Sequence, residues 1–402
     1  MIEYQGTTSP FSYGVVDRFL HKKSQWILLL TLVAPSLGCS STQPLASDPG
    51  LRVEVSGRLV DAVSGQPIAR ATIRIGRTHQ HTTSDSTGAF TLPEVPLGRH
   101  DVMVVAPAYG VSVQFLIVSE EGVVNDAVFR LPRLPSTDAA ASEEGAADEN
   151  RQPERAAPRV FERLYLGSPR FPECTLTNPG TVDFTTEVRG NAEVMHVTAN
   201  EPLVVENRWL GYRMHVVLQG MVMIRRRGGL TMQHENIAAF EDLTPRDEEE
   251  HKRWRKNRRT AYWGSLQHFL TALAAGRAVK EGFRVYAGTS VENTMTLATM
   301  SRRTVAIEVD PSQYVSPTAY AFARVLRFPE EWRVTFPSNV YKEDTDFQGI
   351  RMGDQTSWIR LREGLAPFTV RGDLFDSNSV RLAGYWAVRR VCQLLPHSYQ
   401  PH

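Results

Sequence analysis

The sequence has almost no excess of charge of either sign. Its 402 residues include 45 basic and 44 acidic side chains, so the formal net charge is +1. Nucleic-acid-binding proteins usually carry a basic excess, which makes that class a poor fit. We therefore expect no nucleic-acid partner, and any charged partner must bind at a local patch.

Motifs for metal and phosphate chemistry are also missing. His234-Glu235 is followed by no second histidine at the H-E-x-x-H spacing, and no phosphate-binding glycine loop occurs. His79 and His81 would share one face of a strand, but no third ligand lies near them in the sequence. These absences favour a protein that has no metal or cofactor and is not an enzyme.

Long apolar runs are missing as well. The run from Trp26 to Leu37 is too short for a transmembrane helix, which needs about 20 residues, but it suits the centre of an export signal. Arg18, Lys22 and Lys23 supply the positive flank, and the run ends at Ser36-Leu37-Gly38-Cys39. An ordinary cleaved signal and a short core helix are the alternatives.

This ending resembles the lipobox of bacterial lipoproteins, although Ser36 and Leu37 are transposed relative to the usual order. The resemblance implies lipidation of Cys39 and removal of the preceding residues. We predict an export signal with an N-terminal extension over 1–38 and a tether over 39–50. The expected location is the cell envelope, with the lipid held in the outer membrane.

Cysteine is scarce, and only Cys174 and Cys392 remain once Cys39 is assigned to lipid. Export would place both in a compartment where disulfides persist. A disulfide would tie the start of the second half of the chain to its end. Two independent buried thiols are the alternative, because cysteine is among the most readily buried residues.

Residues 51–134 contain short alternating segments separated by turn residues, a pattern typical of a β-sandwich. Their spaced motif resembles the carboxypeptidase regulatory-like family, a transthyretin-like sandwich. The resemblance implies a module without catalytic residues that commonly precedes outer-membrane receptors and lipoproteins in Bacteroidetes-type bacteria. The motif residues are Gly57, Asp61, Gly65, Pro67, Ala71, Thr83, Asp85, Gly88, Phe90, Leu97, Gly98, Tyr109 and Gly110.

Residues 135–158 contain no aromatic and no large aliphatic side chain, so we predict a disordered acidic linker. Residues 159–398 show no repeated βαβ rhythm, which favours a larger β-rich α+β domain with mostly antiparallel sheet. One long helix is expected over 245–275, with Thr244 as its N-cap and Gly276 as its stop. The overall fold class is mainly β.

The expected helix carries most of the candidate binding residues. Lys252 to Arg259 contains six basic residues in eight, and a solvated face is the alternative to a site for anionic lipid or polysaccharide. Ser265 and His268 are three residues apart and could form a hydrogen-bonded nucleophile and base. The candidate binding residues are Arg225, Arg226, Arg227, Trp254, Arg255, Arg258, Arg259, Tyr262, Ser265 and His268.

The stretches "ANEPLVVENRWLGY" and "WRKNRRTAYWGSLQHFL" resemble the C-terminal part of Bacteroidetes-type carboxypeptidase-like regulatory domain proteins. This resemblance implies an architecture without an established reaction. It favours binding or assembly at the outer membrane beside a TonB-dependent receptor, with that receptor or an envelope polysaccharide as partner. The alternative is a hydrolase of envelope glycans or peptides that uses Ser265 and His268.

Overall fold

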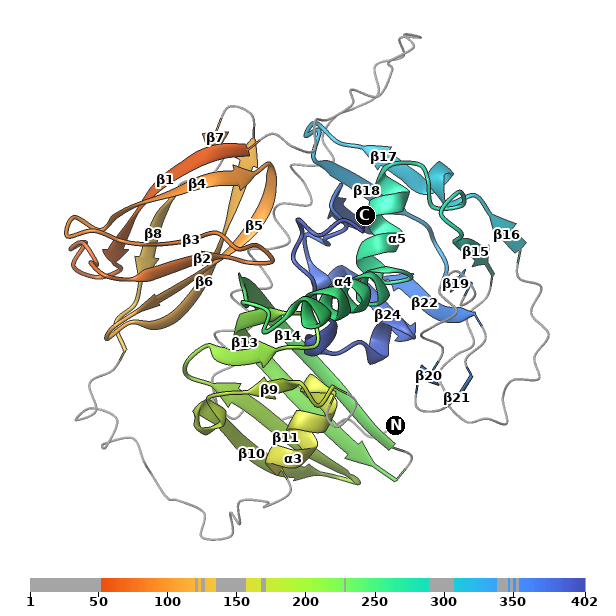
Figure 1. The fold of residues 1–402 in the computed structure, drawn as a ribbon, viewed down its shortest axis with the longest axis horizontal. Helices are drawn as coiled ribbons and strands as arrows, with labels where there is room; N and C mark the ends of the chain where they lie inside the picture. Colours follow the sequence, from red (N-terminus) through yellow and green to blue (C-terminus); the bar gives the residue numbers. More distant parts are fainter. Residues whose placement is uncertain are drawn as a thin grey trace, which may run out of the picture.

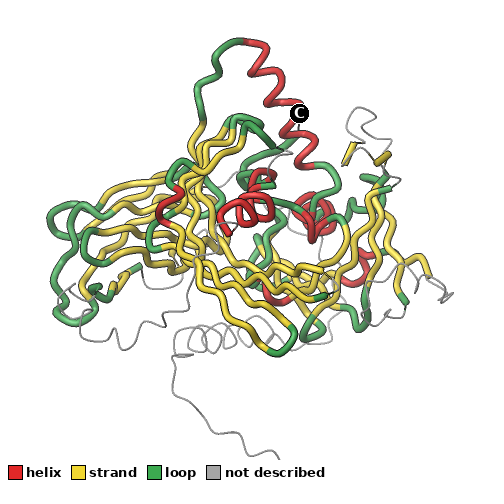
Figure 2. The backbone as a smooth tube through the Cα atoms, turned by 90° about the horizontal axis from the view of Figure 1, so that it is seen from below, coloured by secondary structure: helices red, strands yellow, loops and turns green. Residues whose placement is uncertain are grey.

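The computed structural model describes residues 52–119, 122–123, 127–134, 157–167, 171–227, 229–288, 307–337, 346–347, 350–351 and 354–401. The predicted export signal, Cys39 and residues 135–156 of the predicted linker lie outside this described part. Strands dominate, which confirms the mainly β fold class, and helices α4 and α5 lie near the middle of the molecule (Figures 1 and 2). No helix among the described residues is both long and apolar enough to cross a bilayer.

The first eight strands form a β-sandwich, as predicted. One sheet has the order β4-β1-β8 and the other β3-β2-β5-β6-β7. Apolar residues that alternate along the strands meet between the sheets, where Leu59, Ile73 and Phe129 are almost fully buried. The strands are β1 Arg52–Asp61, β2 Thr72–Ile75, β3 His81–Thr83, β4 Ala89–Pro96, β5 Gly98–Ala106, β6 Gly110–Ser119, β7 Gly122–Val123 and β8 Val128–Leu131.

Beyond the sandwich, a separate sheet is built around the long strand β13, and it is called the second sheet below. Strands β11 and β12 pair with the two halves of one edge of β13, and β14 pairs with its other edge. Helix α3 (Ala157–Phe161) and the π-helical turn Glu162–Leu166 pack into the core of this sheet through Phe161 and Tyr165. The strands are β9 Cys174–Leu176, β10 Val182–Arg189, β11 Ala192–Ala199, β12 Leu203–Asn207, β13 Tyr212–Arg226 and β14 Gly229–Asp242.

The remaining strands surround a separate hydrophobic core, so the region 159–398 has two cores. One sheet has the order β16-β15-β19-β22-β24, another has the order β17-β18-β23, and β20 pairs with β21. The strands are β15 Arg284–Ala287, β16 Ile307–Val309, β17 Val315–Pro317, β18 Ala323–Arg327, β19 Trp332–Phe336, β20 Asp346–Phe347, β21 Ile350–Arg351, β22 Gln355–Leu361, β23 Leu365–Thr369 and β24 Val380–Gly384. Short 3-10 turns span Pro179–Thr181, Pro311–Tyr314, Ser377–Ser379, Trp386–Val388 and Val391–Gln393.

The single long helix predicted over 245–275 is wrong, because the segment forms two helices, α4 (Glu248–Tyr262) and α5 (Leu266–Ala274). The chain breaks at Gly264, whose φ is +71° and where a Cβ would lie 1.9 Å from the side-chain oxygen of Gln355. Ser265 then caps α5 by accepting a hydrogen bond from the backbone N–H of His268. The predicted N-cap is also wrong, since Asp247 rather than Thr244 caps α4.

Arg77 joins the β-sandwich to both of the other cores. Its backbone N–H donates to Ala238 O at 2.6 Å, and its carbonyl accepts from the N–H of His397 at 2.7 Å. Its guanidinium donates to Leu395 O at 2.8 Å and to the side chain of Gln267, at the start of α5, at 2.7 Å. One residue of the sandwich therefore contacts β14, α5 and the C-terminal segment.

The sandwich also packs directly on the second sheet. Met103 of β5 is 1% exposed and lies in an apolar cluster with Val217, Ile237 and Ala239 of β13 and β14. Arg74 pairs with Glu241 of β14 at 2.9 Å. The interface thus combines apolar burial with charge pairing at its margin, as in stable contacts between domains.

A disulfide closes the second half of the chain. Cys174, at the start of β9, is bonded to Cys392 in the C-terminal segment, with 218 residues of sequence separation and a Cα–Cα distance of 6.1 Å. Both cysteines belong to the core of the second sheet. The bond fixes the C-terminal segment against that sheet after the chain has passed through the other core.

We expect the double substitution Cys174→Ser and Cys392→Ser to lower the free energy of unfolding by up to about 5 kcal/mol, because the bond removes loop-closure entropy from the unfolded chain. Urea unfolding with and without reductant measures this effect. Reductant should destabilise the unsubstituted protein and leave the double variant unchanged. Equal unfolding curves for the two proteins under oxidising conditions would contradict the prediction.

Candidate functional site

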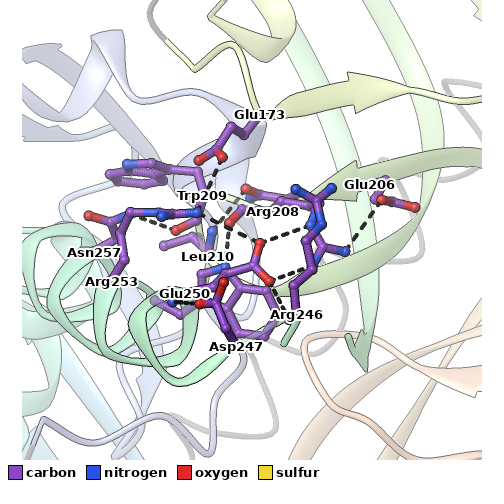
Figure 3. A network of polar contacts seen from close by, with 12 residues as sticks. Glu173, Glu206, Arg208, Trp209, Leu210, Arg246, Asp247, Glu250, Arg253 and Asn257 are labelled. Atoms are coloured by element: carbon purple, nitrogen blue, oxygen red, sulfur yellow. Dashed lines mark hydrogen bonds and ion pairs between the residues drawn. The ribbon is translucent and has the colours of Figure 1, made fainter. Parts of the chain in front are cut away.

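The basic helix α4 is held to the second sheet by a buried ion pair. Arg208, between β12 and β13, donates to both carboxylate oxygens of Glu250 at 3.0 and 2.6 Å, and the backbone N–H of Arg246 adds a third hydrogen bond at 2.6 Å (Figure 3). The Arg208 guanidinium lowers the pKa of Glu250 to about 2. This bidentate geometry fixes the start of α4 against the turn that carries Arg208.

The next two turns of α4 bind the carbonyls of the same turn. The indole N–H of Trp254 donates to Arg208 O, Asn257 donates to Trp209 O at 2.8 Å, and Arg258 donates to Leu210 O at 2.7 Å. Trp254 is 1% exposed. Two of the predicted binding residues, Trp254 and Arg258, therefore support the fold and do not form a binding surface.

Three other predicted binding residues of this segment fall on different sides of the helix. Tyr262 is buried in the core of the second sheet. Arg255 and Arg259 are exposed, and Arg255 lies 3.9 Å from Glu248. Of the candidates on α4, only these two arginines remain open to a partner.

Ser265 and His268 are close together but do not form a nucleophile–base pair. The Ser265 hydroxyl accepts from the backbone N–H of His268 at 3.1 Å. The Gly264 N–H donates to Nδ1 of the His268 ring at 3.0 Å, so the ring proton is on Nε2, which faces the carboxylate of Glu281 at 2.9 Å. Both ring nitrogens are therefore occupied, and the fully buried ring is out of reach of a substrate.

The predicted arginines of β13 line a concavity at the tip of the second sheet. Arg225, Arg226 and Arg227 lie beside the turn between β10 and β11, around a hollow of about 440 Å³. Arg225 pairs with Glu193 at 3.0 Å. Arg226 and Arg227 are exposed, and neither has an ion pair with another described residue. The hollow is completed by Val188, Gly190, Asn191, Ala192 and Glu193.

The residues contributed by β10 and β11 were missed by the sequence reasoning. Glu193 faces Arg225 across the strand pair, so the register of β11 on β13 brings the two together. The signal available was the dipeptide Gly190-Asn191, which is typical of a tight hairpin turn. That signal predicts a hairpin, but not the strand that it lies against.

His79 and His81 do not form a metal site. His79 lies 3.4 Å from Asp242 of β14 and packs near the ring of Tyr212, while His81 is exposed. No group of three or more His, Cys, Asp or Glu side chains within the described ranges could hold a metal ion. His79 acts in the contact between the sandwich and the second sheet.

Comparison with known families now adds an identification for the β-sandwich. Residues 54–132 match the family model of the carboxypeptidase regulatory-like domain. This sandwich is a carboxypeptidase regulatory-like domain. The match spans a fifth of the chain, and no curated protein matches the sequence significantly.

Three solved structures show weak similarity. A proposed carbohydrate-binding protein from Bacteroides uniformis is 11% identical, with a TM-score of 0.16 over 48% of this chain and 100% of that one. A DUF3823 family protein from Bacteroides ovatus is 8% identical, with a TM-score of 0.16 over 48% and 82%. A 9R-lipoxygenase from Cyanothece is 8% identical, with a TM-score of 0.15 over 65% and 52%. These similarities are too low to assign a function.

The motif residues of the carboxypeptidase regulatory-like domain stabilise its turns. Asp61 accepts from the backbone N–H groups of Val63 and Ser64, each at 2.9 Å, and from the hydroxyl of Tyr109 at 2.8 Å. These bonds, led by the one from Ser64, lower the pKa of Asp61. At Gly88, where φ is +74°, a Cβ would lie 2.4 Å from a backbone carbonyl. Asp61, Tyr109 and Gly88 therefore have structural roles.

We expect the free energy of unfolding to fall by about 3 kcal/mol through His268 alone as the pH drops from about 6.5 to about 4. Burial lowers the pKa of this ring to about 4, whereas the unfolded chain binds the proton near 6.5, so acid favours unfolding within that window. Urea unfolding at several pH values measures the slope. His268→Gln should flatten it by one proton. An unaltered slope in His268→Gln would contradict this assignment.

Proposed function

We propose that this chain is an exported, non-catalytic binding protein of the cell envelope, and that its ligand is anionic. The observation that carries the proposal is the concavity of about 440 Å³ beside Arg226 and Arg227, two exposed arginines without an ion pair to another described residue. A hollow of this size falls within the range of small-ligand sites. A carboxylate or phosphate could accept charge-assisted hydrogen bonds from the guanidinium groups of both arginines.

Export is supported by the disulfide between Cys174 and Cys392, since such bonds persist mainly outside the cytoplasm. We further propose that Cys39 carries a lipid that holds the protein in the outer membrane. An acidic envelope polysaccharide is then the ligand, and a TonB-dependent receptor is the neighbour that the family resemblance implies. The carboxypeptidase regulatory-like domain packs against the second sheet away from the concavity.

A hydrolase built on Ser265 and His268 is not proposed. Its base would need a free ring nitrogen near the Ser265 hydroxyl, and both ring nitrogens of His268 already have other partners. Its nucleophile is engaged as the cap of α5. The polar pair at this break in the helix is accounted for by the fold.

Lipidation of Cys39 predicts that the protein made in its native envelope partitions into the detergent phase of a Triton X-114 separation. Cys39→Ser should move it to the aqueous phase, because the anchor is lost while the folded part is unchanged. The variant lacking Cys174 and Cys392 is the matched control and should stay in the detergent phase. Recovery of the unsubstituted protein from the aqueous phase would refute the anchor.

Anion binding at the concavity predicts that Arg226→Gln with Arg227→Gln weakens binding of a short uronic-acid oligomer at least about tenfold, because two charge-assisted hydrogen-bonding groups are removed. Isothermal titration calorimetry measures the change. Arg58→Gln with Arg130→Gln removes the same charge from exposed positions of the sandwich and should have no effect. Phosphatidylglycerol vesicles distinguish a lipid phosphate from a sugar acid. Equal binding by both variants would exclude the concavity as the site.

A further inference from the structure

The sheet of order β16-β15-β19-β22-β24 has one buried face and one face whose described side chains are exposed or half-buried, called the open face below. Its inner face packs on α5 through Val285, Trp332 and Ile359, all of which belong to the same hydrophobic core. In Figure 1 this sheet lies on the side of the molecule opposite the carboxypeptidase regulatory-like domain. The register places these outward residues in the strands: Arg284, Tyr286, Glu308, Arg333, Thr335, Thr356, Trp358, Arg360, Arg381 and Ala383.

Two aromatic rings and an arginine lie in one row across this face. Tyr286 of β15 is directly opposite Arg333 of β19, and Arg333 is directly opposite Trp358 of β22. The Arg333 guanidinium lies over the Tyr286 ring, 4.5 Å from its centroid. Neighbouring strands are about 4.8 Å apart, so the backbones of the two strands that carry these rings are roughly 10 Å apart.

Trp358 is 36% exposed, although indoles are usually buried. Gly384, on the neighbouring strand, has φ of +68°, and a Cβ there would lie 2.8 and 2.9 Å from two atoms of the indole ring. The absence of a side chain at Gly384 therefore lets the indole lie close to the backbone of β24. The exposed part of the indole offers an apolar surface on which a sugar could stack.

The charge of this face is one-sided. Its outward strand residues include four arginines and one glutamate, Glu308. Arg360 of β22 is directly opposite Arg381 of β24, and neither forms an ion pair with another described residue. Like charges directly opposite each other destabilise a strand pair. An anion bound between them would remove this cost.

We propose that the open face binds an extended acidic polysaccharide. The apolar C–H face of one sugar stacks on Trp358, and carboxylates along the chain pair with Arg333, Arg360 and Arg381. A protein partner fits less well, because protein hot spots sit in pockets and this surface is a flat row on a sheet. The inference rests on the anionic ligand class proposed above, but it uses none of the residues of the concavity.

The test measures binding of polygalacturonate to the full chain by affinity electrophoresis and calorimetry. Trp358→Ala should weaken binding about tenfold through loss of stacking. Arg360→Gln with Arg381→Gln should weaken it by a similar factor and reduce its salt dependence, since charge pairs are screened by salt. Thermal unfolding checks that each variant is folded, and Trp358→Phe, which keeps an aromatic ring, should retain most of the affinity.

Three controls make the outcome decisive. Arg58→Gln with Arg130→Gln should bind polygalacturonate normally, and dextran, a neutral polysaccharide, should bind neither the variants nor the unsubstituted protein. In protein that already carries Arg226→Gln and Arg227→Gln, Trp358→Ala should still weaken binding of polygalacturonate. The open face can therefore be tested even if the concavity binds no anion. Three results would overturn the proposal. They are unchanged affinity for polygalacturonate in folded Trp358→Ala, binding of dextran as strong as that of polygalacturonate, and binding of an acidic protein in place of the polysaccharide.

Discussion

Arg77 of the sandwich forms hydrogen bonds to β14, to α5 and to the C-terminal segment, and so joins three hydrophobic cores. Its backbone extends the hydrogen bonding of β14, and its guanidinium binds Leu395 O and the side chain of Gln267. Asp373, which lies 3.8 Å from this guanidinium and 2.8 Å from the ring of His397, balances the buried charge. Removing one member of such a group leaves another charge unpaired, which costs more than the contact itself contributes. This junction and the apolar cluster around Met103 together hold the sandwich against the rest of the molecule.

The disulfide and the buried pair of Arg208 with Glu250 extend this constraint through the second half of the chain. One bonds the C-terminal segment to the second sheet, and the other fixes α4 on the turn between β12 and β13. The concavity and the open sheet face are therefore carried on strands whose positions are fixed. A binding group on a rigid strand loses less conformational entropy on contact than one on a loop. Both surfaces carry several arginines, whose planar groups suit carboxylates.

Local features predicted the carboxypeptidase regulatory-like domain well, because Asp61, Asp85 and Gly88 act through turns that close within a few residues. The helix was harder, since the apolar periodicity continues past Gly264 and only Gln355, ninety-one residues later, makes the break necessary. The same limit applied to the sites. Trp254 and Arg258 have the composition of a binding surface, but the turn that they bind belongs to other strands. Side chains that act through long-range partners leave no local pattern.

Although the net charge is only +1, the arginines fall into two groups, those paired inside the molecule and those exposed without a partner among the described residues. The first group includes Arg74, Arg77 and Arg208, each of which binds a carboxylate or a carbonyl of another element within the molecule. Arg226 and Arg360, in contrast, are exposed and have no such partner among the described residues. Because the interior cations are neutralised locally, their field at the surface is short-ranged, and the proposed anion sites lie at the unpaired arginines. A nearly neutral protein can thus present two distinct cationic surfaces without the long-range repulsion of a basic one.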